Sequence, residues 1–228
     1  IWATGVTWTV AHHCVAAMPD EPLSPAVGGA VPATAPLRTP LDAPVAERAA
    51  RWLAGATDAA SPDTQLFARL IAVRDVRHEL ALLGLPQPAW RALVARHFAH
   101  AAALAPLSAL PPVDTGEYAA FVDTLRALLL THASGTVDAD DALCLASIIA
   151  HACLRPDHLW RDLGLAGREE VTWMLTRYFP KLVALNVDNL RWKKFLAQQR
   201  ALSLGLEPGP APGCPGCEDY RHCFPGRH

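Results

Sequence analysis

Three cysteines lie within ten residues of one another in the last part of the printed sequence. Cys214, Cys217 and Cys223 form the pattern C-x2-C-x5-C, with Pro-Gly between the first two. Such a C-x2-C pair predicts a tight turn that directs two thiolates toward one ion or cluster. The five intervening residues allow the third sulfur to return to the same place. Because thiolates on loops bind iron–sulfur clusters and zinc, the pattern predicts a metal centre.

The spacing alone leaves the identity of the metal open. Three thiolates suit a 3Fe-4S cluster, or a 4Fe-4S cluster in which one iron takes another ligand. The run differs from the bacterial and plant ferredoxin patterns, which argues against an electron-transfer ferredoxin. Zinc requires four ligands, and His228 would complete the pattern C-x2-C-x5-C-x4-H. With zinc, the tail would be a zinc-knuckle binding module whose metal is purely structural; the third alternative is three unligated cysteines.

Composition restricts the class of protein. Of the 228 residues, 51% are hydrophobic and 18% charged, which predicts a folded core. A net charge of −2 argues against nucleic acid or an anionic membrane surface as partner. No apolar run approaches the ~18 residues of a membrane span. Sparse cysteines and the lack of Lys or Arg in residues 1–17 argue against export and disulfides, so we expect a cytoplasmic protein.

Two proline-dense tracts divide the chain into three parts. Residues 1–44 are predicted to be a disordered, Pro-rich leader, and Met18 is the expected start, with residues 1–17 an upstream extension. On that interpretation His12, His13 and Cys14 form no site. A helical domain is predicted for residues 45–206, and a Cys-rich metal-binding loop for residues 207–228, where the prolines at 207–216 exclude a helix.

The spacing of apolar residues between these tracts predicts an all-α, helical bundle-like fold. Ser61 is a helix N-cap candidate, and acidic residues suit the first turn of the helix after Asp138. A weak internal echo relates 83–98 to 163–179, because each has Leu-Gly-Leu, an amphipathic stretch and an aromatic pair. Duplication and a chance match explain this echo equally well. The predicted helices are 45–54, 61–83, 88–104, 115–132, 138–154, 158–163, 167–178 and 189–204.

Longer motifs add a family resemblance. Residues 152–165, Ala-Cys-Leu-Arg-Pro-Asp-His-Leu-Trp-Arg-Asp-Leu-Gly-Leu, resemble the A-C-x4-H-L-W-x-D-L-G-L signature of the NifQ family. Phe179-Pro180, Asn186 and the Trp-Lys-Lys-Phe run at 192–195 also resemble elements of that family, as does the Cys-rich stretch 211–224. The match is dense over about 140–224 and only a helical pattern over 45–135. One departure is Gly209, where the family has the first of four tail cysteines.

Resemblance to the NifQ family implies an accessory protein of nitrogen fixation. The family supplies molybdenum for assembly of the nitrogenase iron–molybdenum cofactor, on an iron–sulfur cluster that associates with molybdenum. Its implied partners are molybdate and the NifEN and NifH assembly proteins. This is a metallochaperone role, and no Ser/His/Asp triad, phosphate loop or nucleotide fingerprint indicates an enzyme. With Gly209 in place of a cysteine, the tail supplies three thiolates, which leaves a 3Fe-4S cluster open and a fully thiolate-bound 4Fe-4S cluster in doubt.

Residues outside the tail are candidates for the same centre. Cys153 and His158 belong to the family motif and are predicted to add metal ligands, although Cys153 also suits a buried helix face and His158 a first helical turn. Arg191, Lys193 and Lys194 could contact molybdate or an acidic partner surface, or form a solvated helix face. Cys144 and His151 are predicted to be structural. Trp160, Trp173 and Trp192 are predicted to be core residues rather than site residues.

Overall fold

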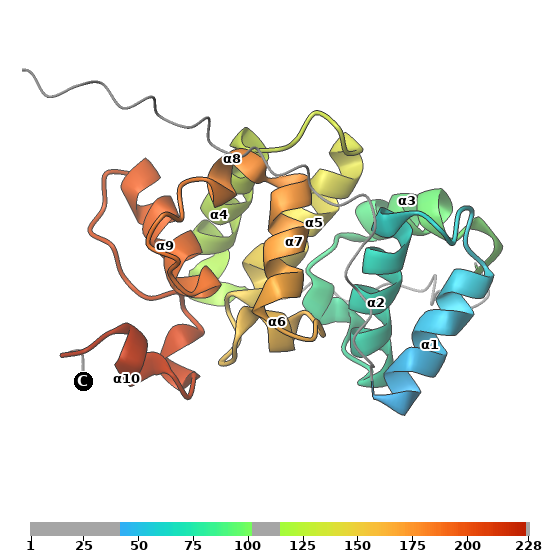
Figure 1. Ribbon diagram of the computed structural model, residues 1–228, viewed down its shortest axis with the longest axis horizontal. Helices are drawn as coiled ribbons and strands as arrows, with labels where there is room; N and C mark the ends of the chain where they lie inside the picture. Colours follow the sequence, from blue (N-terminus) through green and yellow to red (C-terminus); the bar gives the residue numbers. More distant parts are fainter. Residues whose placement is uncertain (1–41, 102–114, 227–228) are drawn as a thin grey trace, which may run out of the picture. The chain divides into compact units, whose positions relative to one another are not determined.

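Helices provide all the regular secondary structure in residues 42–101 and 115–226, the part of the chain described by the computed structural model (Figure 1). The predicted all-α fold is therefore confirmed for these residues. They all belong to one compact unit of the chain. Except for residues 42–44, the predicted leader lies outside the described residues, as does His228.

The first helical hairpin consists of α1 (Ala43–Ala54) and α2 (Pro62–Val76). The Ser61 hydroxyl accepts the Thr64 N–H, and Pro62 stands in the first turn, where its missing N–H costs nothing. The prediction that this helix continues to residue 83 is wrong. His78 has a φ of 57°, which no α-helix accommodates, and a separate 3-10 turn covers Leu80–Leu83.

The next helix, α3 (Gln87–His97), is shorter than predicted. Phe98 has a φ of −135°, outside the helical range, so the α-helix stops before it and a 3-10 turn, Ala99–Ala101, follows. The last predicted residues of this helix, 102–104, lie outside the described residues.

The second hairpin repeats the design of the first. A 3-10 turn at Gly116–Tyr118 leads into α4 (Ala119–Thr131), and α5 (Ala139–Ala152) follows. The Asp138 carboxylate accepts the N–H groups of Asp140 and Asp141 at 2.9 and 3.0 Å. This N-cap fixes the start of α5 where the sequence predicts it. Two helices complete this part, α6 (Leu159–Asp162) and α7 (Arg168–Tyr178).

The remaining helices position the cysteine tail. The one-turn α8 (Pro180–Val183) was not predicted, and α9 (Trp192–Ser203) begins three residues later than expected. The tail holds a 3-10 turn at Cys214–Gly216 and the one-turn α10 (Tyr220–Cys223). The expectation of no helix at 207–216 is therefore wrong for one turn, because proline at position 215 is tolerated in the first turn of a short helix.

The described helices form two copies of one unit. The first copy is α1, α2, the turn at Leu80–Leu83 and α3; the second is α4, α5, α6 and α7. In both, a left-handed glycine follows the short helix, with φ of 65° at Gly84 and 67° at Gly164. Helices α3 and α7 are each 11 residues long. The similarity between residues 83–98 and 163–179 in the sequence therefore corresponds to a repeated order of structural elements.

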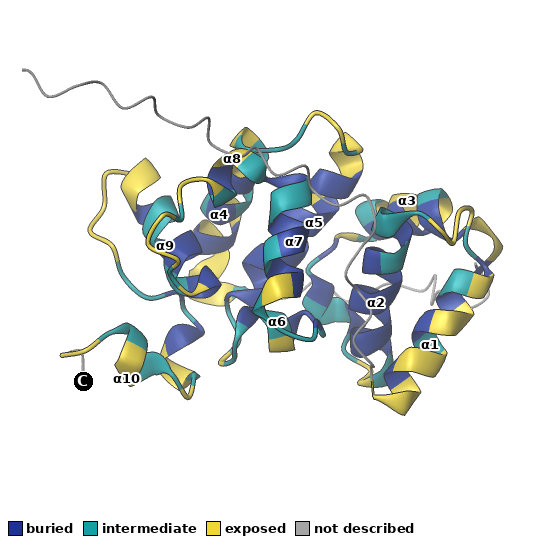
Figure 2. Ribbon diagram, viewed as in Figure 1, coloured by how far each residue is buried: buried dark blue, intermediate teal, exposed yellow. Residues whose placement is uncertain are grey.

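The two units hold each other by reciprocal contacts. Arg177 binds both carboxylate oxygens of Asp63, each at 2.6 Å, and Asp63 lies in the first turn of α2. In the opposite sense, Arg96 and His97 at the end of α3 lie 2.7 and 2.9 Å from Asp141 in the first turn of α5. Both glycine turns also press against the other unit's long helix: an added Cβ at each would lie 2.1 Å from a side chain there. In Figure 2, α2 and α5 are the most buried of the described helices.

Candidate metal centre

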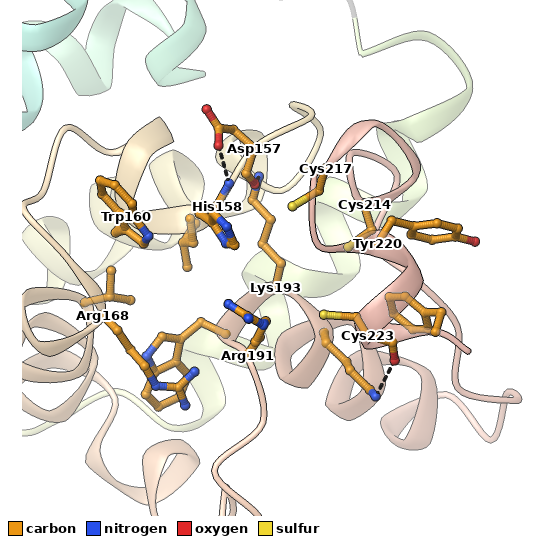
Figure 3. Close-up of a pocket in the computed structure, with 15 residues that line it drawn as sticks. Asp157, His158, Trp160, Arg168, Arg191, Lys193, Cys214, Cys217, Tyr220 and Cys223 are labelled. Carbon is orange, nitrogen blue, oxygen red and sulfur yellow. Dashed lines mark hydrogen bonds between the residues drawn. The ribbon is translucent and has the colours of Figure 1, made fainter. Parts of the chain in front are cut away.

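A pocket opens where the cysteine tail meets α6, α7 and the start of α9 (Figure 3). Its empty volume is about 590 Å³, including the part open to solvent. Cys214, Cys217 and Cys223 all line it, as do His158 and Arg191. In Figure 3 the sulfur atoms of Cys217 and Cys223 point into the space that His158 and Arg191 face from the other side. The structure thus brings together the tail residues that the sequence selects.

The three thiols differ in their surroundings. Cys214 is buried, whereas Cys217 and Cys223 are half-buried at the pocket wall. Burial raises the pKa of Cys214 and of Cys223, and nearby cations oppose that shift: Lys193 for Cys214, and Arg191 and Lys194 for Cys223. In the described part of the chain, no three His, Cys, Asp or Glu side chains form a group that could hold a single metal ion. The three thiols share one open pocket.

The tail is positioned by the loop 153–158. Gly213 donates its N–H to the Cys153 carbonyl at 3.0 Å. A Cβ on Gly213 would lie 2.0 Å from the Arg155 carbonyl oxygen, and one on Gly216 would lie 2.4 Å from the Cβ of Pro156. Only glycine allows so close an approach of the two backbones. The C-x2-C turn therefore packs directly against the loop that follows α5.

Cys153 is fully buried and is not among the residues that line the pocket. Burial raises the pKa of its thiol to about 12, although the charge of Lys193 acts in the opposite direction. Its carbonyl accepts the N–H of Gly213, and the nearby Cys214 thiol contributes to its raised pKa. A ligand role for the Cys153 thiol stays a prediction.

His158 lies at the pocket, where its Nε2 is 3.2 Å from a carboxylate oxygen of Glu218 and 3.2 Å from one of Asp219. Its ring stacks on Trp160, with 6.1 Å between centroids and an interplanar angle of 12°. Trp160 is therefore part of the pocket wall, which corrects its assignment to the core. Trp192 is buried as predicted but also reaches the pocket.

The three predicted cations occupy different settings. Arg191 pairs with Asp219 at 2.8 Å, and Lys194 donates to the Cys223 carbonyl at 2.6 Å. Lys193 is buried and donates to the carbonyls of Arg155 (2.8 Å) and Asp157 and to the Asp162 carboxylate. Its ammonium group therefore faces the loop 153–158.

Arg168 is a pocket residue that the sequence did not single out. Its guanidinium donates to Asn189 Oδ1 at 2.6 Å and to the Leu190 carbonyl at 2.7 Å, and lies 5.4 Å from the Trp192 ring centroid. Asn186, one of the family elements, hydrogen-bonds the backbone N–H and carbonyl of Leu190 and so fixes this loop. The sequence feature that pointed to this loop was Asn186, which the family motif includes. It gave no indication of Arg168.

The NifQ family model matches residues 47–225, which include both helical units and the whole pocket. The chain belongs to the NifQ family. It is 44% identical to the NifQ protein of Azotobacter vinelandii over 45% of this chain and 51% of that protein. It is 43% identical to a NifQ homolog of Sinorhizobium fredii over 44% of this chain and 43% of the homolog. It is also 34% identical to the NifQ protein of Rhodobacter capsulatus, over 53% of this chain and 67% of that one.

In these NifQ matches the chain spans about half the length of the first curated relatives. No solved structure matches the chain. Among the helices of the described residues, none has the length and apolar character needed to cross a membrane. The pocket with its three thiols is therefore a feature of a helical domain of the NifQ family.

Proposed function

We propose that this chain is an accessory protein of nitrogenase cofactor assembly that carries molybdenum on an iron–sulfur centre. The observation that supports the proposal is the pocket, which places Cys214, Cys217 and Cys223 beside a cationic wall. The family assignment gives this pocket its biological context.

An iron–sulfur cluster fits the donor set better than a single zinc ion. Soft thiolates are the ligands that such clusters use, and Cys214, Cys217 and Cys223 would hold it. A zinc knuckle would need a fourth ligand such as His228, which lies outside the described residues. Cations near the thiols, Arg191 and Lys194 among them, offset the negative charge of thiolates and sulfides. When bound, the cluster would supply sulfide and an open iron position for association with molybdenum.

Molybdenum is the proposed cargo, and the pocket is suited to its arrival and transfer. Half-buried Cys217 and Cys223 and the opening to solvent leave the centre accessible to an assembly partner. The resemblance names NifEN and NifH as those partners, in the cytoplasm. Arg191 and Lys194 are placed to contact molybdate, His158 is a candidate ligand beside them, and Cys153 remains a candidate behind the wall.

The test is metal and sulfide analysis of the full chain purified without oxygen from cells that coexpress cluster-assembly proteins. We expect iron, acid-labile sulfide and molybdenum together, with loss of all three in Cys217→Ser and retention in the matched Cys144→Ser variant, whose thiol lies outside the pocket. His158→Ala should lower molybdenum more than iron. A colourless protein with one zinc per chain would contradict the proposal and favour a zinc-knuckle binding module.

A further inference from the structure

We propose that the cationic wall of the pocket is an oxyanion-binding subsite that the tail's own carboxylates close. Glu218 and Asp219 occupy hydrogen-bond donors that an incoming tetrahedral oxyanion, such as molybdate, would take. The inference rests on the proposed function for the identity of the oxyanion, and on the contacts of the metal-free chain for the subsite itself.

The carboxylates belong to the five-residue spacer between Cys217 and Cys223. Asp219 lies 2.8 Å from Arg191 and 3.2 Å from His158 Nε2. Glu218 lies 3.2 Å from the same imidazole nitrogen and 3.0 Å from Arg161. These four contacts tie the spacer to α6 and to the residue before α9. The two carboxylates of the spacer therefore already occupy the cationic wall, as a bound anion would.

The contacts made by Arg161 and Arg191 are weak enough to exchange, whereas His158 and Asp219 are 14% and 31% exposed. The side chains of Glu218, Arg191 and Arg161 are 61%, 45% and 43% exposed. Ion pairs at such exposure stabilise a protein by about 0–1 kcal/mol each, because water competes for both partners. A dianion with four oxygens can accept charge-assisted hydrogen bonds from several of the same donors at once.

Two more cations stand beside the seated carboxylates and lack a carboxylate of their own. Among the described residues, neither Arg168 nor Lys194 forms an ion pair; both donate to carbonyl or amide oxygens. Arg168 and Arg191 lie close together, and burial together with the Arg191 charge lowers the pKa of Arg168. Two like charges facing one space favour an anion between them. In Figure 3 these two arginines lie on the side of the pocket opposite Cys214 and Cys217.

Exchange at Arg191 has a consequence for the thiols. When an oxyanion displaces Asp219, the spacer loses two of the four ion-pair contacts that join it to α6 and Arg191. The half-buried thiols that flank the spacer, Cys217 and Cys223, then become more accessible. Oxyanion binding and thiol exposure are coupled, and by thermodynamic linkage each favours the other.

The experiment uses the reduced, metal-free full chain and measures sodium molybdate binding by calorimetry, with sodium sulfate as a second probe and chloride at matched ionic strength. We expect Asp219→Asn to bind molybdate about tenfold more tightly, which corresponds to about 1.4 kcal/mol, and Glu218→Gln to have a smaller effect. Arg191→Gln and Arg168→Gln should each weaken binding at least several-fold. Glu169→Gln is the control, because it removes one negative charge that acts on Arg168 but contacts neither Arg191 nor His158.

A second measurement separates exchange from a general charge effect. The alkylation rate of Cys217 and Cys223 should rise when molybdate is added to wild type, and should be high without molybdate in Asp219→Asn. Equal changes in affinity for Asp219→Asn and Glu169→Gln, or alkylation that does not respond to molybdate, would overturn the proposal. Similar responses to sulfate and molybdate support an oxyanion subsite of broad specificity. Molybdate binding by a chain that never acquires iron would refute the proposed function while leaving the subsite intact.

Discussion

The two helical units share every element, yet the thiol pocket is built on the second alone. One difference lies in the connection that follows the long helix of each unit. Three residues, 77–79, separate α2 from the short helix of the first unit, whereas six residues, 153–158, separate α5 from α6. The longer loop supplies His158 to the pocket and the backbone against which Gly213 packs.

This comparison separates what maintains the fold from what makes the site. The reciprocal contacts at Asp63 and Asp141 use residues that both units possess, and they lie in the shared helices. The pocket uses an enlarged loop, α9 and the tail, which the first unit lacks among the described residues. Variants of the first kind should therefore change global stability, and variants of the second kind should change the tail.

The largest expected effect is on the contact between the end of α3 and α5. Asp141→Ala removes a buried carboxylate, 5% exposed, that contacts both Arg96 and His97. Because Arg96 is 26% exposed and keeps Asp138 and Asp140 within 3.7 Å, we expect about 3 kcal/mol, the lower end of the cost of breaking a buried ion pair. Asp63→Ala, at a carboxylate 17% exposed, should cost about 1.5–3 kcal/mol because it mainly removes charge-assisted hydrogen bonds.

Urea unfolding followed by circular dichroism checks both values, with Asp123→Ala, at an exposed ion pair of α4, as control. If the two aspartate variants unfold like the control, the reciprocal contacts do not hold the units together.

The second prediction concerns Lys193, which the sequence offered as a molybdate or partner contact. Its buried ammonium group donates to the Arg155 and Asp157 carbonyls. Both carbonyls belong to the loop 153–158, which is longer than the corresponding loop of the first unit. Lys193→Met should therefore lower the free energy of unfolding of the metal-free chain by about 1–3 kcal/mol, because it leaves buried acceptors unpaired. Lys194→Met, at a less buried neighbour, is the control. Unchanged stability together with weaker molybdate binding would restore the contact interpretation.

The features that the sequence predicts correctly depend on local interactions, and those that it misses depend on contacts between distant residues. The N-cap of α5 is local, so Asp138 fixed that boundary in advance, and the helices follow from their apolar spacing. The break at His78 could not be predicted, because a positive φ at a residue other than glycine depends on tertiary packing. The cysteines were recognisable from spacing alone. The partners of the carboxylates beside them were not, since Glu218 meets Arg161 across 57 positions.

A third, more local effect is expected at the contact between the tail and the enlarged loop. In Gly213→Ala the new Cβ would overlap the Arg155 carbonyl oxygen, at 2.0 Å, so the tail must move away. Overpacking of this kind costs about 1–3 kcal/mol, which here falls on the tail rather than on the helical units. We expect Cys214 to react with a thiol reagent about tenfold faster, with little change in urea unfolding. Gly135→Ala, where an added Cβ meets nothing within 4 Å, is the matched control.

The smallest effect is a pH dependence of the contact at Asp63. Burial alone would raise the pKa of Asp63, but hydrogen bonds from Arg177 and Tyr178 outweigh it and lower that pKa below its ordinary value of 3.8. The unfolded chain therefore takes up this proton more readily than the folded one. The stabilisation by the Asp63 carboxylate is complete above pH about 4 and is lost as the pH falls through the lowered pKa of the folded state. Asp63→Asn lacks this contribution at every pH. The difference in unfolding free energy between wild type and Asp63→Asn should thus be constant from pH 7 to 5 and shrink below pH 4 in urea titrations. A difference that stays constant down to pH 2 would mean that the Asp63 carboxylate acts through packing rather than through its charge.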